Sequence, residues 1–101
     1  MVPTKYGFAV SAETVSMDIN RLTNQLWKLI PMRENKEDWI HQLNTVIIEI
    51  TGLNEIFSTK SEQQLIILLS KLEGLRIQDT TFEVYRKTVF ETISLLREMR
   101  L

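Results

Sequence analysis

The sequence predicts an all-α fold, an antiparallel up-down-up-down bundle of four helices. In four separate segments, apolar residues recur at alternating spacings of three and four, which places them on one face of a helix. The chain also has only three Gly and two Pro among its 101 residues, too few for a turn-rich β fold. The expected connections are short, so successive helices must pack as antiparallel neighbours.

The first helix is expected over residues 14–30. Ser11, Thr14 and Ser16 are the alternatives for its N-cap, because each can accept a hydrogen bond from a backbone N–H of the first turn. We expect Pro31 to end the helix, since the residue before a proline is disfavoured in the α region. The apolar stripe consists of Val15, Ile19, Leu22, Leu26 and Leu29.

The second helix is expected over residues 36–57, with Asn35 as its N-cap. Gly52 lies inside this pattern and costs about 1 kcal/mol relative to Ala in a helix interior. The sequence therefore leaves open whether the helix continues, kinks or breaks at Gly52. The stripe is the most regular in the chain and consists of Trp39, Leu43, Val46, Ile50, Leu53 and Phe57.

The third helix is expected over residues 61–75, from a capping box formed by Ser61 and Gln64 to a stop at Gly74. Its stripe consists of Leu65, Leu68, Leu72 and Leu75. The first two turns are apolar on nearly every side because they also contain Ile66, Ile67 and Leu69. Such a helix is usually deeply buried, so we expect this one to be the most buried of the four.

The fourth helix is expected over residues 80–99, with Asp79 as its N-cap or with Thr80 and Glu83 as a capping box. Its stripe consists of Phe82, Tyr85, Val89, Ile93 and Leu96. Together the four helices make residues 14–101 a single domain.

Residues 1–13 precede the bundle as a short arm. Within it Tyr6, Phe8 and Val10 alternate with smaller or polar residues, a strand-like period of two. A single strand is not stable alone. The arm is therefore either a frayed, flexible tail or a segment that packs over the bundle end or onto a partner.

The composition restricts the function. The net charge is -1, from 12 basic and 13 acidic residues, and exerts no general attraction on nucleic acid or anionic membranes. The chain has no Cys, which excludes disulfides, thiol catalysis and cysteine-based zinc sites and is compatible with a cytoplasmic location. No apolar window approaches the ~18 residues of a transmembrane helix, so no membrane association is expected.

No motif indicates catalysis. His41 is the only histidine, and although Glu37 lies one turn before it, a di-iron bundle needs carboxylates from all four helices and Glu-x-x-His motifs from two. The chain has no Gly-rich phosphate loop and no nucleophile at a Gly-rich turn. We therefore expect no catalytic residue, no metal, no cofactor and no small-molecule substrate: the protein is predicted not to be an enzyme.

Several apolar residues lie off the stripes. Monomers rarely expose a large contiguous apolar patch, so a cluster of these residues would indicate a protein interface, whereas scattered ones would be ordinary surface. The function this favours is a non-enzymatic protein–protein interaction module, a small accessory or regulatory protein that forms an oligomer or docks a protein partner. The candidate partner-binding residues are Ile40, Ile47, Ile48, Gly52, Val84 and Leu95, and Ile67 is similarly placed.

Trp27 and Trp39 flank the first interhelical turn. Large aromatic side chains dominate core burial, so we expect both to close that end of the core. An exposed pair would instead be a candidate hot spot for binding.

Two alternatives remain open. A small subunit of a nucleic-acid-binding assembly would use the basic residues of the third and fourth helices, provided that they gather on one face; the candidates are Arg76, Arg86, Lys87 and Arg97. The chain length and the four-helix layout are also similar to those of bacteriocin-immunity proteins. That resemblance concerns the architecture, with no shared motif, and implies an immunity function only by analogy.

Overall fold

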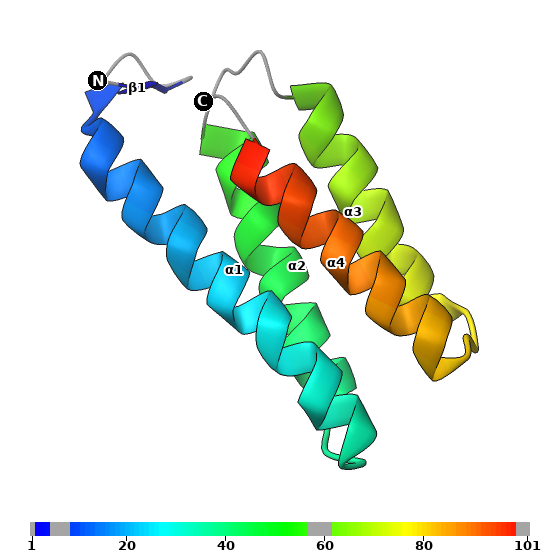
Figure 1. Ribbon diagram of the computed structural model, residues 1–101. Coiled ribbons are helices and arrows are strands. Elements are labelled where there is room, and N and C mark those ends of the chain that lie inside the picture. Colours follow the sequence, from blue (N-terminus) through cyan, green and yellow to red (C-terminus); the bar gives the residue numbers. More distant parts are fainter. Residues whose placement is uncertain (1, 5–8, 57–61, 99–101) are drawn as a thin grey trace.

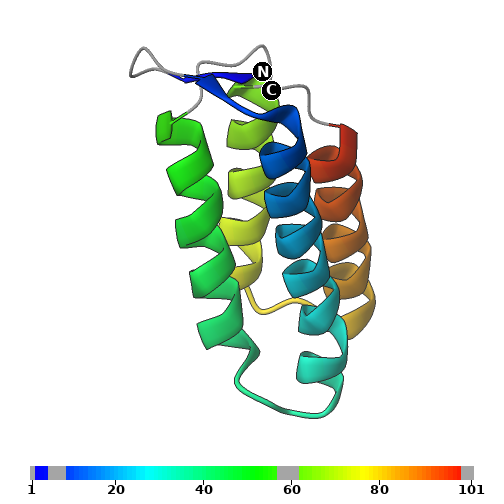
Figure 2. The same cartoon turned by 90° about the vertical axis from the view of Figure 1, so that its left-hand side faces the viewer.

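The computed structural model describes residues 2–4, 9–56 and 62–98 and confirms the four-helix bundle (Figure 1). The helices are α1 (Ala12–Glu34), α2 (Trp39–Ile56), α3 (Glu62–Ile77) and α4 (Phe82–Glu98). Figure 2 shows them alternating in direction along the bundle axis. Each helix packs against the next in the chain, and α4 packs against α1. Consequently α1 and α3 occupy opposite corners of the bundle, as do α2 and α4.

The core is formed by the predicted stripes. Ile19, Trp39 and Phe82 are partly buried at its edge, whereas the other stripe residues in the described ranges are buried. Phe57 lies outside the described residues. The buried stripe residues are Val15, Leu22, Leu26 and Leu29 of α1; Leu43, Val46, Ile50 and Leu53 of α2; Leu65, Leu68, Leu72 and Leu75 of α3; and Tyr85, Val89, Ile93 and Leu96 of α4.

α1 begins at Ala12 and not at residue 14, because Ser11 is its N-cap and the Ser11 side chain accepts a hydrogen bond of 3.1 Å from the Thr14 N–H. The prediction that Pro31 ends the helix is wrong. Pro31 lies inside α1, which continues to Glu34. A proline lacks the N–H that would bond to the carbonyl four residues earlier, and here the helix loses that bond in its last turns without being broken.

The end of α1 is set by the backbone at Lys36, which has a φ of 59° in the left-handed region. The Lys36 N–H donates to the Arg33 carbonyl (3.1 Å), and the Glu37 N–H donates to the Met32 carbonyl (2.8 Å). This pair of bonds is a Schellman motif, which satisfies carbonyls left without partners at a helix C-terminus. Asn35 is therefore the C-cap of α1 and not, as predicted, the N-cap of α2.

α2 consequently begins at Trp39, three residues later than predicted. The Asp38 side chain accepts a hydrogen bond of 3.2 Å from the His41 N–H, the interaction expected of an N-cap. The helix is continuous through Gly52 to Ile56. An added Cβ at Gly52 would meet no atom within 4 Å.

Replacing Gly52 by Ala should therefore stabilise the protein by about 0.5–1 kcal/mol, because Ala loses less backbone entropy in a helix and nothing obstructs its methyl group. Urea unfolding followed by circular dichroism measures the change. A loss of stability in the Gly52→Ala variant would mean that the space beside Gly52 is filled or that the helix is not regular there.

α3 and α4 also differ from the prediction at their ends. α3 passes through Gly74 and ends at Ile77. α4 begins at Phe82, where the Thr81 hydroxyl accepts a hydrogen bond of 3.3 Å from the Val84 N–H, so neither Asp79 nor Thr80 is the cap. The predicted Ser61 capping box lies outside the described residues.

The expectation that the third helix is the most buried is wrong. Ile66 is 51% exposed and Ile67 is 48% exposed. Each helix of a four-membered ring has two packed neighbours and one side left to solvent, and in α3 that outer side carries isoleucines. Its apolar surface therefore extends beyond what the bundle covers.

Before α1, the strands β1 (Val2–Pro3) and β2 (Ala9–Val10) pair antiparallel, with Val2 opposite Val10. Val10 packs against the core, so this part of the arm contacts the bundle. Tyr6 and Phe8 lie outside the described residues. None of the helices in the described ranges has the length and apolar character needed to cross a membrane.

At the end of the bundle where α1 meets α4, an arginine and three aromatic rings form a cluster. The Arg33 guanidinium lies 4.5 Å from the ring centre of Tyr85 and 5.4 Å from that of Trp39. Arg33 also donates hydrogen bonds to the hydroxyl (3.2 Å) and the carbonyl of Thr80. Phe82 stacks on the Tyr85 ring at 6.4 Å.

Tyr85 is the fully buried centre of this cluster, and its hydroxyl donates a 2.9 Å hydrogen bond to the Leu29 carbonyl. Burial raises the pKa of the Tyr85 hydroxyl well above its ordinary value, and the charge of Arg33 opposes this shift only in part. The phenol therefore stays neutral and keeps its proton for the Leu29 carbonyl. This bond and the contacts of Arg33 tie α4 and the segment before it to the end of α1.

Candidate protein-docking surface

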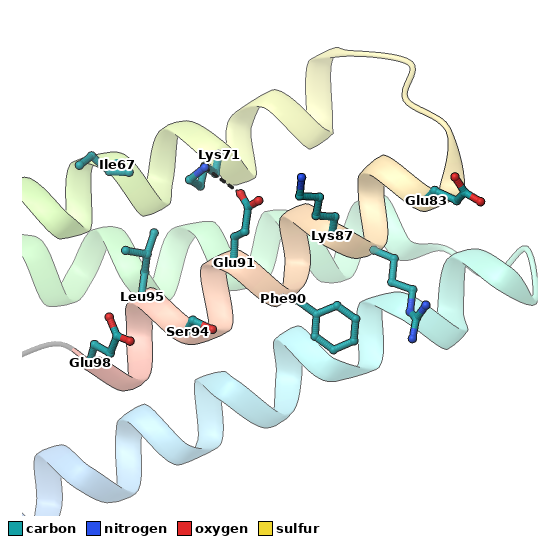
Figure 3. A pocket seen from close by; sticks show the side chains of 10 residues that line it. Ile67, Lys71, Glu83, Lys87, Phe90, Glu91, Ser94, Leu95 and Glu98 are labelled. Atoms are coloured by element: carbon teal, nitrogen blue, oxygen red, sulfur yellow. Dashed lines mark hydrogen bonds and ion pairs between the residues drawn. The ribbon is translucent and has the colours of Figure 1, made fainter.

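A groove of about 710 Å³ lies on the outer surface of α3 and α4 (Figure 3). We call it the α3–α4 groove. It is lined by Ile67 and Lys71 of α3 and by Glu83, Arg86, Lys87, Phe90, Glu91, Ser94, Leu95 and Glu98 of α4. The groove is largely open to solvent.

An ion pair joins the two helices across the groove. The Lys71 Nζ lies 2.9 Å from Glu91 Oε2. Since the helices run in opposite directions, the residue one turn before Lys71 and the residue one turn after Glu91 must lie level with each other. These are Ile67 and Leu95, which Figure 3 shows projecting from the two helices at the same end of the groove. Leu95 also packs partly against the core.

Phe90 lies on the other flank of α4, toward α1. Its ring meets that of Trp27 edge to face, with 5.0 Å between ring centres. The guanidinium of Arg86 lies 5.2 Å from the Phe90 ring centre. Trp27 is thus on the outer surface of the bundle, whereas Trp39 packs against the core. The prediction that both tryptophans close the core holds for Trp39 and is wrong for Trp27.

The charges of the α3–α4 groove balance. Three basic residues, Lys71, Arg86 and Lys87, line it together with three acidic ones, Glu83, Glu91 and Glu98. The hydrogen bond from Lys71, followed by the positive charges of Lys71 and Lys87, lowers the pKa of the Glu91 carboxyl below its usual value, so Glu91 is ionised at neutral pH. The groove therefore presents fixed charges of both signs beside its apolar residues.

The structure divides the predicted partner-binding residues between two surfaces. Ile40 and Ile48 are exposed on α2, and Val84 is exposed on α4. Because α2 and α4 occupy opposite corners of the bundle, these residues do not form one patch. Gly52 is partly exposed on α2. Of the predicted residues, Leu95 lines the groove, together with Ile67.

Ile47 is a correction to the predicted surface. It is only 7% exposed and belongs to the core. It follows Val46 and is one turn from Leu43, so it lies at the edge of the inward stripe of α2. A residue at this edge is buried when a helix packs beside it, and the periodicity of one helix cannot show whether that happens.

The basic residues do not gather on one face. Arg76 lies at the seam between α2 and α3, where it forms an ion pair with Glu73 and donates a hydrogen bond of 3.3 Å to Asn44 of α2. Arg86 and Lys87 instead line the α3–α4 groove, and Arg97 is exposed near the end of α4. The nucleic-acid alternative requires one basic face, and these positions do not provide it.

Within the described residues, no three His, Asp or Glu side chains come together as metal ligands would. His41 is exposed in the first turn of α2. Comparison of the chain with models of protein families, with curated proteins and with solved structures finds no match.

The groove contains residues that the sequence interpretation did not select, notably Lys71, Phe90, Glu91 and Ser94. The spacing of Phe90 and Leu95 could have indicated a binding surface, because both residues lie off the apolar stripe and on opposite sides of α4. Only the arrangement of the helices shows that Leu95 faces Ile67 and that Phe90 faces Trp27.

Proposed function

We propose that the chain is a non-enzymatic protein-interaction module that self-associates, with a second copy of the chain docking on the α3–α4 groove. The observation that carries this proposal is the combination in one groove of apolar residues and balanced charges: Ile67 is exposed and Leu95 is partly exposed on one side, Phe90 is partly exposed on the other, and the charges sum to zero. Protein interfaces typically pair an apolar centre with a polar rim.

The apolar part of the groove supplies the driving force. Ile67 leaves about half of its side chain in water, although the same helix buries four leucines in the core. Removing apolar surface from water is worth about 25 cal/mol per Å². A bound protein surface would gain this free energy, whereas a polar ligand would leave the groove's isoleucine and leucine uncovered.

The charges favour a second copy as the occupant. In a symmetric dimer the same surface is used by both copies, so it must be complementary to itself. A groove with three basic and three acidic residues is compatible with this condition, whereas a groove of one sign would repel its copy. The net charge of -1 adds little repulsion between whole chains.

Sedimentation equilibrium of the full chain up to high micromolar concentration tests the proposal. We expect the wild type to form dimers and Ile67→Glu to be monomeric, because a carboxylate at that position would be desolvated in the interface. Ile48→Glu is the matched control: Ile48 is 71% exposed on α2, away from the groove, so this variant should still dimerise. Circular dichroism checks that both variants keep their helicity.

A wild type that stays monomeric throughout this range would contradict the proposal. So would dimers that Ile48→Glu dissociates and Ile67→Glu leaves intact, because the interface would then lie on α2. Loss of helicity in Ile67→Glu would mean that Ile67 is part of the fold; Ile67→Ser, which adds no charge, then provides the same comparison.

A further inference from the structure

We infer that the two copies pack α4 against α4 in antiparallel orientation, about a two-fold axis that passes beside Ser94, with Lys87 of each copy opposite Glu98 of the other. This inference rests on the proposed self-association and specifies its geometry. It is carried by the order of charged, small and apolar residues along the outer face of α4.

The first argument is the placement of charge. Lys87 and Glu98 both line the groove and are exposed. They lie about three turns apart, so they project from the same side of α4 at levels separated by about 16 Å. Neither forms an ion pair with another residue in the ranges 2–4, 9–56 and 62–98. Because both side chains are exposed, their charges can reach a second copy.

The direction of packing follows from these two positions. If the second copy ran parallel to the first, Lys87 would face Lys87 and Glu98 would face Glu98, which is unfavourable. In the antiparallel orientation each Lys87 faces a Glu98, and the symmetry forms the pair twice. Such charge complementarity fixes orientation and suppresses wrong arrangements more than it adds affinity.

The second argument is the size of the residues at the centre. The midpoint between Lys87 and Glu98 lies just before Ser94, whose exposed side chain is the smallest in the groove. Helix axes approach to about 8–10 Å depending on the side chains at the contact, so a serine there permits close packing. In the antiparallel register Ser94 lies opposite Glu91 of the second copy. Its hydroxyl can donate to that carboxylate, whose Oε2 already binds Lys71.

The third argument is the position of the apolar residues. A two-fold axis perpendicular to both α4 helices places the α3 side of one copy beside the α3 side of the other. The α1 sides of the two copies then also lie beside each other. Ile67 and Leu95 of the two copies then meet on the α3 side, and the two Phe90 rings meet on the α1 side. Both apolar flanks of the groove are covered by one arrangement, with the charged pairs at its ends.

Charge exchange tests this geometry. Lys87→Glu and Glu98→Lys should each weaken self-association by about tenfold or more, since each places like charges opposite each other twice, and tenfold corresponds to about 1.4 kcal/mol. Mixing the two single variants should restore association as a heterodimer, because one surface is then acidic and the other basic. The double variant Lys87→Glu/Glu98→Lys should associate like the wild type. Sedimentation equilibrium measures all four samples.

Lys28→Glu is the matched control, since Lys28 is exposed on the outer face of α1; it should leave association unchanged. If the wild type dimerises and Ile67→Glu prevents it, but the two charge variants associate normally, the antiparallel register is wrong and the proposed function stands. The register is also wrong if the mixture does not form heterodimers. If the wild type is monomeric, both the function and the register are wrong.

Discussion

Tyr85→Ala should lower the free energy of unfolding by about 3–5 kcal/mol, the range for deleting a large buried aromatic side chain. The Tyr85 ring is fully buried and packs against Trp39, with 5.1 Å between ring centres, and against Phe82. The substitution also removes the surface beneath the Arg33 guanidinium, 4.5 Å from the Tyr85 ring centre. Such a loss is a large part of the stability of a domain of this size. Urea unfolding followed by circular dichroism measures it.

Tyr85→Phe separates the two contributions of this side chain. It keeps the ring contacts and removes only the hydroxyl that donates to the Leu29 carbonyl, so we expect a cost of about 1–2 kcal/mol. If Tyr85→Ala cost no more than Tyr85→Phe, the aromatic cluster would contribute little, and α4 would be held to α1 mainly by the leucines of the core.

Ile50→Ala should cost about 2–5 kcal/mol, because it leaves a cavity in the centre of the bundle. Ile50 is fully buried, and Ile48, two residues earlier on the same helix, is 71% exposed. Ile48→Ala is therefore a matched control with the same chemical change, and its effect should stay within about 0.5 kcal/mol. Equal costs for the two variants in urea unfolding would show that the inward face of α2 is assigned incorrectly.

The apolar spacing predicted the core well because burial in a bundle depends on one face of each helix. Every stripe residue in the described ranges is buried or packs at the edge of the core. The short connections predicted the antiparallel order for a similarly local reason. These features follow from helix geometry alone, and no knowledge of the neighbouring helices is needed to find them.

The helix ends were less predictable because several residues near each end could act as the cap. Pro31 has no N–H, but a single missing bond near the end of a long helix does not outweigh the packing of the residues around it. The actual end depends on the left-handed conformation of Lys36, a residue that enters this region without the advantage of glycine. Its residue type alone favoured Asn35 as the N-cap of α2, whereas in the structure Asn35 is the C-cap of α1.

The residues of the candidate docking surface were predicted only in part. Leu95 and Ile67 were selected because they lie off the stripes, and the structure places both in the groove. Ile47 was selected by the same criterion and is buried, because a flank residue is covered or exposed according to the helix beside it. Which helices are neighbours is a tertiary property, so single-helix periodicity could not separate Ile47 from Leu95.

A dilution series of ¹⁵N-labelled wild-type protein observed by NMR would reveal self-association residue by residue. We expect the amide resonances of Ile67, Ser94 and Leu95 to shift as the concentration falls and the dimer dissociates. Those of Asn24 and Lys28, on the outer face of α1, should stay in place. Resonances that do not change with concentration anywhere in the chain, or that change only on α1 and α2, would contradict self-association through the α3–α4 groove.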